Sequence, residues 1–335
     1  MVESMVYLIT GIAGFIGSSL AHALVEHGET VRGIDNFSTG RRENLADISS
    51  RVDVRELDLS ENSPALEAAC QGVDYILHQA ALPSVPRSVA DPLSSNNSNV
   101  NGTLNLLLGA KKAREGEGRL KRIVYAASSS AYGDTPTLPK REDMNPSPIS
   151  PYAVAKLTGE LYMQSFYRCY GLETVSLRYF NVFGPRQDPS SQYSGVISKF
   201  ITAMLRGEAP VIYGDGKQSR DFTYIDNVVS ANLLACTAPT SQAAGKMFNL
   251  ACGVQVTLNE TFETIKQITG YKGNVKYDKP RSGDILHSLA DVSAAQKHLS
   301  FKILVNFEEG LRRTVAWYRQ QGAGSEKSAA SSFRA

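Results

Sequence analysis

The chain has 335 residues, of which 42% are hydrophobic, which is enough apolar surface for one large or two modest domains. The net charge of +2 comes from scattered basic residues, a pattern that argues against a nucleic-acid partner. No apolar stretch approaches the ~20 residues that span a bilayer, and the first residues lack a signal-peptide pattern. We therefore expect a globular, cytoplasmic protein that binds neither nucleic acid nor membranes.

The four cysteines give no sign of a metal or redox site. Cys70, Cys169, Cys236 and Cys252 are far apart, form no Cys-x-x-Cys pair and have no histidine at ligand spacing. Apolar or small residues flank each of them, which favours buried, reduced thiols. The five histidines are equally dispersed, and we expect no metal site.

The first half of the chain alternates short apolar runs with amphipathic segments. The runs that indicate strands are Val6–Thr10, Thr30–Ile34, Val52–Glu56, Tyr75–His78, Arg122–Ala126 and Thr174–Arg178. The segments that indicate helices are Ser18–His27, Ser63–Gln71, Asn101–Arg114 and Tyr152–Tyr170. Strict alternation of this kind predicts an α/β fold with a doubly wound, parallel Rossmann sheet.

The second half is less regular, because prolines and glycines interrupt it after about residue 180. We expect a Rossmann domain over 1–180 and a smaller, mixed α/β substrate-binding domain over 181–320. A helix over Ile225–Cys236 and a strand over Lys246–Ala251 are expected to return the chain to the first domain, within 225–252. Residues 321–335 lack periodicity, which predicts a disordered tail.

A glycine-rich turn joins the first strand to the first helix. It contains Gly11, Gly14, Phe15, Ile16 and Gly17. Backbone without side chains at such a turn approaches a pyrophosphate closely, although glycines also serve ordinary turns.

The acidic residue that ends the second strand strengthens the interpretation of the glycine turn as part of a dinucleotide site. Asp35 stands where a carboxylate accepts hydrogen bonds from an adenosine ribose and repels a 2′-phosphate. NAD is therefore favoured over NADP. The alternative is that Asp35 is only a turn residue before Asn36.

Three further sites around the sheet fit a bound cofactor, and each has a structural alternative. Asp58 and Leu59 follow the third strand as an adenine-contacting pair, or Asp58 is only a cap. The run His78-Gln79-Ala80-Ala81 closes the fourth strand with small residues that suit either close approach of a cofactor or tight packing under a helix. Asn99 either stabilises the site or caps a helix.

Tyr152 and Lys156 are the candidate catalytic pair, since positions i and i+4 share a helix face. A free tyrosine has a pKa of about 10, and lowering it toward ~7 takes roughly 4 kcal/mol. We expect Lys156 and a nicotinamide charge to supply this stabilisation of the phenolate. Ser128 follows the fifth strand at the carboxyl end of the sheet, where such folds bind ligands; the alternative is a serine-rich turn that caps the next element.

Five longer stretches carry a family resemblance. They are Asp35–Gly40, His78–Ser88, Ser128–Gly133, Arg178–Gln187 and Ser219–Phe222. On these stretches the chain resembles the extended short-chain dehydrogenase/reductase family from Val6 to about Tyr318. Within it the likeness is to UDP-hexose 4-epimerases, most of all to the UDP-N-acetylglucosamine type.

The resemblance implies a redox cycle with no net redox change. Tyr152 takes the proton of the sugar 4-hydroxyl while hydride passes from C4 to NAD, Ser128 bonds O4, and Lys156 tunes Tyr152 and holds the nicotinamide ribose. The 4-keto sugar then turns over and receives hydride on its opposite face. Further cofactor-binding residues implied by the family are Asn36, Ser38, Gly40, Asp58, Leu59, Gln79, Ala80, Ala81, Asn99 and Tyr179.

The resemblance also implies a UDP-sugar site, for UDP-GlcNAc/UDP-GalNAc and also UDP-Glc/UDP-Gal. Its residues are Pro83, Ser84, Val85, Ser129, Ser130, Asn181, Gln187, Gly195, Val196, Lys199, Val211, Tyr213, Arg220, Arg281 and Asp284. The two arginines bind the diphosphate, Asp284 a ribose, and Val211–Tyr213 flank the uracil. Alternatively, Arg220 and Asp221 form a local ion pair and Arg281 is a solvated charge. Gly195 leaves space for a 2-acetamido group, whereas Pro83 stands where some acetamido-specific relatives have glycine.

Other functions of the same fold are disfavoured. A 4,6-dehydratase needs an acid and a base where Ser129 and Ser130 stand, and a UDP-glucuronate decarboxylase resembles a chain with glutamate in place of Ser130; a UDP-glucuronate epimerase is a further alternative. A non-catalytic NAD-binding regulator conflicts with the intact Ser128, Tyr152 and Lys156.

Relatives of this fold commonly dimerise through their two long helices. Here these are Asn101–Arg114 and Tyr152–Tyr170, both with wide apolar stripes. Burial within the monomer explains the stripes equally well. We expect a homodimer.

Overall fold

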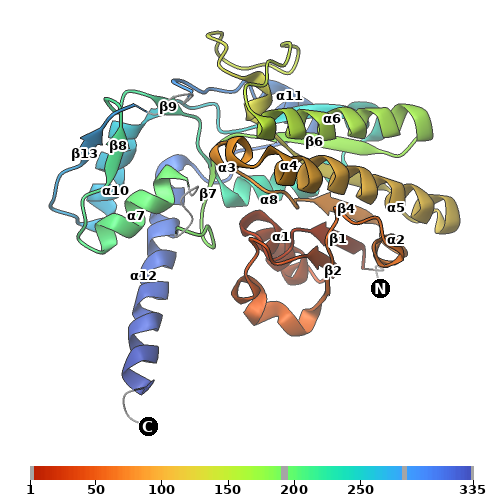
Figure 1. Cartoon of the computed structure of the whole chain (residues 1–335), viewed down its shortest axis with the longest axis horizontal. Coiled ribbons are helices and arrows are strands. Elements are labelled where there is room, and N and C mark those ends of the chain that lie inside the picture. The colour runs from red at the N-terminus through yellow and green to blue at the C-terminus, as the bar shows by residue number, and fades with distance from the viewer. Residues whose placement is uncertain (1–3, 190–194, 281–284, 333–335) are drawn as a thin grey trace.

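A parallel sheet forms the centre of the computed structural model, which describes residues 4–189, 195–280 and 285–332 (Figure 1). Its seven strands follow the order β11-β6-β5-β4-β1-β2-β3, and every neighbouring pair is parallel. The strands are β1 (Val6–Thr10), β2 (Thr30–Asp35), β3 (Val52–Glu56), β4 (Tyr75–His78), β5 (Arg122–Ser128), β6 (Thr174–Tyr179) and β11 (Lys246–Leu250). The predicted α/β class and parallel Rossmann sheet are confirmed.

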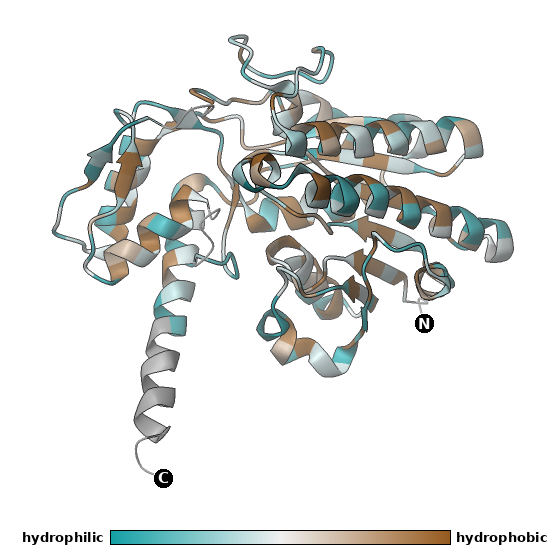
Figure 2. Ribbon diagram, in the orientation of Figure 1, coloured by the Kyte–Doolittle hydropathy of each residue, from teal (hydrophilic) through white to brown (hydrophobic). Residues whose placement is uncertain are grey.

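Helices cover both faces of the sheet, because alternate residues of each strand point to opposite sides. Ile9, Leu77 and Val124 belong to one core with α1 (Phe15–Glu26) and α8 (Ile225–Thr237). Their neighbours in sequence, such as Leu8 and Ile76, belong to the other core. The helices on that second face are α2 (Pro64–Cys70), α5 (Gly102–Glu117) and α6 (Pro151–Tyr170). Figure 2 accordingly shows the central strands as predominantly hydrophobic.

The second half of the chain builds a smaller lobe from short elements. Its three two-stranded sheets pair β7 (Val182–Phe183) with β10 (Thr223–Tyr224), β9 (Ser219–Arg220) with β12 (Val256–Thr257), and β8 (Val211–Tyr213) with β13 (Lys276–Asp278). The helices of this half besides α8 are α7 (Val196–Leu205), α9 (Thr240–Ala243), α10 (Leu258–Thr269), α11 (Ser293–Leu299) and α12 (Phe307–Ser332).

Part of the second half lies in the large sheet. Strand β11 pairs with β6 in parallel, and α8 packs against α1. The domain limits at 1–180 and 181–320 stay a prediction. Helix α12 extends into the segment expected to be a disordered tail; its side chains from residue 322 onward lie outside the described residues, and the tail also stays a prediction.

Short helical elements complete the first half and bring its loops to the carboxyl ends of the strands. They are the 3₁₀ helices η1 (Arg42–Arg51) and η3 (Ser129–Tyr132), the α-helices α3 (Val85–Ala90) and α4 (Pro92–Asn96), and the π-helix η2 (Asn97–Asn101). No helix in the described ranges has an apolar stretch long enough to cross a bilayer.

The cysteine prediction was wrong at one position. Cys70, Cys236 and Cys252 are buried free thiols, but Cys169 is exposed. It lies in the last turn of α6, where Tyr170 is also 53% exposed. Apolar neighbours in sequence therefore did not imply burial at the end of a long helix.

A buried ion pair fixes α6 to the sheet. Glu160 of α6 accepts two hydrogen bonds from Arg178 of β6, at 2.9 Å from Nε and 2.8 Å from Nη2. The two side chains are only 2% and 0% exposed. The guanidinium also lies 4.4 Å from the ring centre of Tyr132 in η3. This pair joins α6, the sheet and the turn after β5.

Removing one partner leaves the other charge buried without compensation, so we expect Glu160→Ala to lower the free energy of unfolding by about 3–5 kcal/mol. Urea denaturation of the full chain measures this change. The matched control is Glu308→Ala, which breaks an exposed i,i+4 pair with Arg312 and should cost about 0.5 kcal/mol or less. Equal losses in the two variants would contradict the prediction.

Candidate active site

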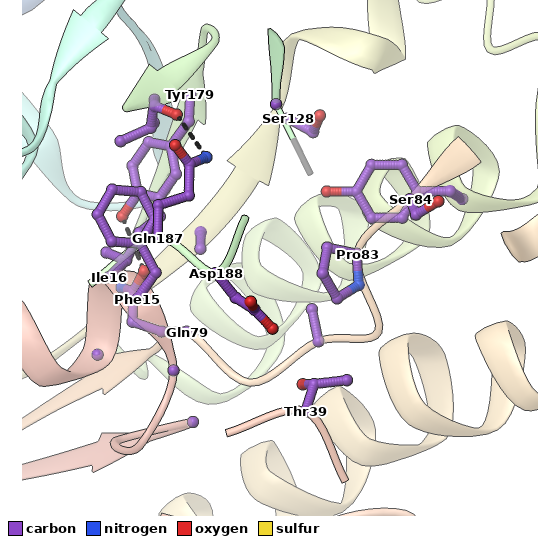
Figure 3. A pocket seen from close by; sticks show the side chains of 18 of the residues that line it. Phe15, Ile16, Thr39, Gln79, Pro83, Ser84, Ser128, Tyr179, Gln187 and Asp188 are labelled. Carbon is purple, nitrogen blue, oxygen red and sulfur yellow. Dashed lines mark hydrogen bonds between the residues drawn. The ribbon is translucent and has the colours of Figure 1, made fainter. Parts of the chain in front are cut away.

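A cavity of about 930 Å³ opens at the carboxyl ends of the central strands and is lined by both halves of the chain (Figure 3). Predicted cofactor and catalytic residues in its wall are Gly11, Gly14, Phe15, Ile16, Gly17, Ser38, Gly40, Gln79, Ala81, Ser128, Tyr152, Lys156 and Tyr179. Predicted substrate residues in its wall are Pro83, Ser84, Ser129, Ser130, Asn181, Gln187, Gly195 and Arg220. Ligands of α/β sheets bind at this edge.

The glycine turn leaves backbone exposed at the cavity. Gly11 has φ = +69°, and a Cβ there would lie 2.8 Å from the Ala80 backbone. A Cβ on Gly17 would lie 2.0 Å from the Gly11 carbonyl oxygen, so only glycine fits. Helix α1 begins at Phe15 with no side-chain cap on its first N–H groups. Such N–H groups are donors for an anion such as a pyrophosphate.

Asp35 lies behind the cavity wall. Its Oδ2 accepts a hydrogen bond from the Ala13 N–H at 2.9 Å, and its Oδ1 accepts one from the Phe37 N–H at 2.8 Å. Burial raises the pKa of Asp35, and these two N–H donors oppose the rise. The carboxylate thereby shapes the loop that runs from Phe37 to Gly40, which lines the cavity.

Five other predicted cofactor residues also lie outside the wall: Asn36, Asp58, Leu59, Ala80 and Asn99. Asn36 donates to Asp58 at 2.9 Å, and Asp58 accepts from the Ser60 backbone at 2.8 Å, as a loop cap does. Asn99 is buried and bonds both backbone groups of Leu82, at 2.8 Å and 3.2 Å. It therefore holds the loop after β4 from behind.

The catalytic candidates come together at the end of β5 and the start of α6. Ser150 caps α6 through the Ala153 N–H, and Pro151 occupies its first turn, both typical of helix N-termini. This start places Tyr152 in the first turn, where the Ser128 side chain lowers the pKa of its phenol. Lys156 lies one turn further along α6 and is 4% exposed.

Burial dominates the electrostatics of the pair. Burial raises the pKa of Tyr152, and the only group that opposes this among the described residues is Ser128. The Lys156 ammonium donates to the Ala126 carbonyl at 2.8 Å, and burial lowers its pKa to about 7. In the protein alone, the cost of burying the phenolate dominates, and the expectation that Lys156 and a nicotinamide charge together stabilise the phenolate stays a prediction.

The remaining substrate predictions divide into three sets. Val196, Val211 and Tyr213 line a smaller cavity of about 240 Å³, which shares Asn181, Gln187, Gly195 and Arg220 with the first. Val85 and Lys199 line neither cavity. Arg281 and Asp284 lie outside the described residues.

Several wall residues were missed: Phe37, Thr39, Arg41, Asn44, Arg87, Ala126, Ala127, Val182, Arg186, Asp188, Ile285 and Ser288. The family resemblance could have identified four of these residues, because the stretches that carry it include Thr39, Arg87, Val182 and Arg186. Asp188 forms an ion pair of 2.7 Å with Arg41, which only the tertiary structure shows.

Comparison with known proteins places this geometry in a family. The model of the NAD dependent epimerase/dehydratase family matches residues 7–251. The chain belongs to that family. A putative UDP-glucose 4-epimerase of Methanocaldococcus jannaschii is 38% identical over 93% of this chain and 98% of its own length.

Solved structures agree with this assignment. The UDP-N-acetylglucosamine 4-epimerase of Methanobrevibacter ruminantium, in complex with UDP-N-acetylmuramic acid, is 43% identical with a TM-score of 0.89, covering 95% of this chain and 99% of that one. The UDP-glucose 4-epimerase of Thermus thermophilus, in complex with NAD, is 33% identical with a TM-score of 0.84, covering 94% and 99%.

This epimerase/dehydratase family member is thus an enzyme whose cofactor is NAD. The side-chain-free cradle at Gly11 and Gly17 and the free N–H groups of α1 fit the pyrophosphate. Bound NAD supplies a hydride acceptor with a positive ring. In the described part of the chain, no three His, Cys, Asp or Glu side chains gather as a metal site requires.

The contact at Gly17 yields a test of this cradle. We expect Gly17→Ala to weaken NAD binding at least tenfold, because the new methyl group would overlap the Gly11 carbonyl. Equilibrium titration with NAD measures the effect. Gly116→Ala is the control, since a Cβ there meets no atom within 4 Å. Unchanged NAD affinity in Gly17→Ala would show that the turn does not hold the cofactor.

Proposed function

We propose that the enzyme catalyses the NAD-dependent 4-epimerisation of a UDP-hexose through a transient 4-keto sugar. One observation carries this proposal: the side chains of Ser128, Tyr152 and Lys156 line one wall of the cofactor cavity, and the Ser128 side chain lowers the pKa of the Tyr152 phenol. A base, a hydroxyl and a buried cation in one wall suit the oxidation of a secondary alcohol. Relatives at 38% and 43% identity are named as 4-epimerases.

In the first half-reaction, the Tyr152 phenolate accepts the proton of the sugar 4-hydroxyl as hydride leaves C4. The Ser128 hydroxyl holds O4 and stabilises the phenolate. Burial raises the pKa of Tyr152, so the phenolate depends on positive charge in the cavity, from Lys156 and from the nicotinamide ring. In the second half-reaction, Tyr152 returns the proton to O4 after the keto sugar has turned over.

The cavity chemistry disfavours dehydration. Of the described residues in its wall, Asp188 is the only carboxylate, and Arg41 pairs with it. Ser129 and Ser130 occupy the turn after β5, and the Ser130 hydroxyl donates to Ser128 at 2.8 Å. A 4,6-dehydratase needs an acid and a base to eliminate water, and no such pair faces the cavity among these residues.

We propose UDP-GlcNAc and UDP-GalNAc as substrates, together with UDP-Glc and UDP-Gal. The smaller cavity, with Val211 and Tyr213 in its wall, suits the uracil, and Arg220 lines both cavities and suits the diphosphate. Gly195 presents no side chain to the wall that both cavities share, which leaves space for an acetamido group.

Incubation of the purified protein with UDP-GlcNAc and separately with UDP-glucose tests the proposal. We expect each sugar to reach equilibrium with its 4-epimer, followed by nuclear magnetic resonance, with no net consumption of NAD. Accumulation of a 4-keto-6-deoxy sugar would instead identify a dehydratase. Bound NAD without turnover of either sugar would instead support a non-catalytic NAD-binding regulator.

Tyr152→Phe is the matched loss-of-function variant for that assay. It should retain NAD and lose nearly all turnover, since a phenyl ring cannot accept the proton. Tyr170→Phe controls for the substitution itself, because Tyr170 lies on the same helix and is 53% exposed. Wild-type turnover in Tyr152→Phe would refute the assigned base.

Ser128→Ala should shift the pH dependence of turnover. The Ser128 side chain lowers the pKa of Tyr152, so its loss raises that pKa. The ascending limb of the kcat profile should therefore move to higher pH. An unshifted limb with reduced kcat would show that Ser128 contacts only the sugar.

We also propose a homodimer formed through α5 and α6. Leu108 of α5 and Val154 and Leu161 of α6 are 38%, 50% and 54% exposed. Apolar side chains of this size on adjacent helices are typical of an interface. The homodimer stays a prediction.

A further inference from the structure

Three side chains at the edge of the cofactor cavity form a closed ring of hydrogen bonds. Asn232 Nδ2 donates to the Tyr179 hydroxyl oxygen at 2.9 Å, that hydroxyl donates to Gln79 Oε1 at 3.1 Å, and Gln79 Nε2 donates to Asn232 Oδ1 at 3.2 Å. Each residue donates once and accepts once within the ring. Figure 3 shows Tyr179 and Gln79 side by side in the pocket.

One carbonyl fixes the orientation of the Asn232 amide in the ring. Asn232 Nδ2 also donates to the Val228 carbonyl oxygen at 2.8 Å, and a carbonyl oxygen can only accept. The Asn232 amide therefore cannot flip. Its Oδ1 accepts from the Gln79 amide nitrogen at 3.2 Å and also lies 3.1 Å from the Tyr179 hydroxyl, whose single proton can go to this oxygen or to Gln79 Oε1.

The ring of hydrogen bonds links α8 to two residues that line the cavity near Ser128. Asn232 belongs to α8 and is fully buried, whereas Gln79 and Tyr179 line the cavity. Tyr179 ends β6, where its register partner on β5 is Ser128. The ring thus lies at the strand end next to Ser128, where the hydride acceptor has to be.

We propose that Asn232 is a positioning residue for the nicotinamide end of NAD. Through the ring it holds the Gln79 amide and the Tyr179 hydroxyl in one orientation before the cofactor binds, so that neither side chain has to be ordered by binding. It also keeps the Tyr179 proton engaged, which leaves Tyr152 as the cavity tyrosine that transfers a proton. This proposal depends on the family's cofactor and not on the sugar or on epimerisation.

Competition between NAD and ADP-ribose tests the proposal, because ADP-ribose is NAD without its nicotinamide. In the full-length protein purified with its cofactor, bound labelled NAD is exchanged against ADP-ribose to equilibrium. The readout is the ratio of the two dissociation constants. We expect Asn232→Ala to shift this ratio about three- to tenfold in favour of ADP-ribose, the cost of ordering one or two side chains. If Asn232 had a purely structural role, its loss would weaken the binding of NAD and of ADP-ribose equally. An unchanged ratio of the two dissociation constants would therefore overturn the proposal.

Asn227→Ala is the matched control, on the same helix. Asn227 is also fully buried, but its amide bonds the backbone of Leu304 and Val305 and it lies outside both cavity walls. It should lower stability without changing the ratio. A shift equal to that of Asn232→Ala would attribute the effect to general loosening of α8 and overturn the proposal.

A second variant tests whether the ring acts as a unit. Tyr179→Phe removes one member, and the double variant with Asn232→Ala should shift the ratio no further than the larger single change. Additive shifts would contradict a shared ring. If Asn232→Ala does not fold, Tyr179→Phe alone decides, since the same selective loss supports the ring and an unchanged ratio refutes it. No sugar is present in these measurements, so failure of the epimerase proposal leaves them interpretable.

Discussion

The Tyr152 phenol at the first turn of α6 is the group around which the proposed active site is built. Burial opposes its ionisation, so its oxygen has to be held where other groups favour the anion. Two contacts fix the turn: the Ser150 cap, and the Tyr152 backbone N–H, which donates to the buried Ser88 at 3.0 Å. Ser88 belongs to α3, whose cap, Ser84, lines the cavity. The wall of the cavity and the base are therefore one connected structure.

The second half of the chain completes a cavity that the first half begins. Helix α8 supplies the buried Asn232, which is hydrogen bonded to the wall residues Gln79 and Tyr179, and the loop after β7 supplies Asp188, which pairs with Arg41 of the loop after β2. These contacts join segments far apart in sequence. Because α8 packs on α1 and β11 extends the sheet beyond β6, the cofactor wall is supported by both halves of the chain.

The repeating pattern of strands and helices was readable from the sequence because periodicity and burial follow the same backbone geometry. The glycine turn was readable for a similar reason, since the Gly17 contact with Gly11 is local. Asp35 and Asn99 were identified as important residues, but the structure places both behind the wall. A sequence motif shows that a residue type is required at a position and does not show which way the side chain points. Asn232 gave no signal, because its partners, Gln79 directly after β4 and Tyr179 at the end of β6, are far from it in sequence.

The two sides of the reacting centre differ in how firmly they are held. On the cofactor side, a ring of three hydrogen bonds satisfies Asn232, Gln79 and Tyr179 within the protein. On the side proposed for the sugar, the wall includes Gly195 and serines, which present only short side chains to a hexose. An epimerase needs this contrast, because the nicotinamide ring that accepts and returns hydride must stay fixed while the keto sugar turns over. Binding energy must then come from the nucleotide, which is remote from the reacting carbon. The proposed place for the nucleotide is the smaller cavity, which adjoins the first.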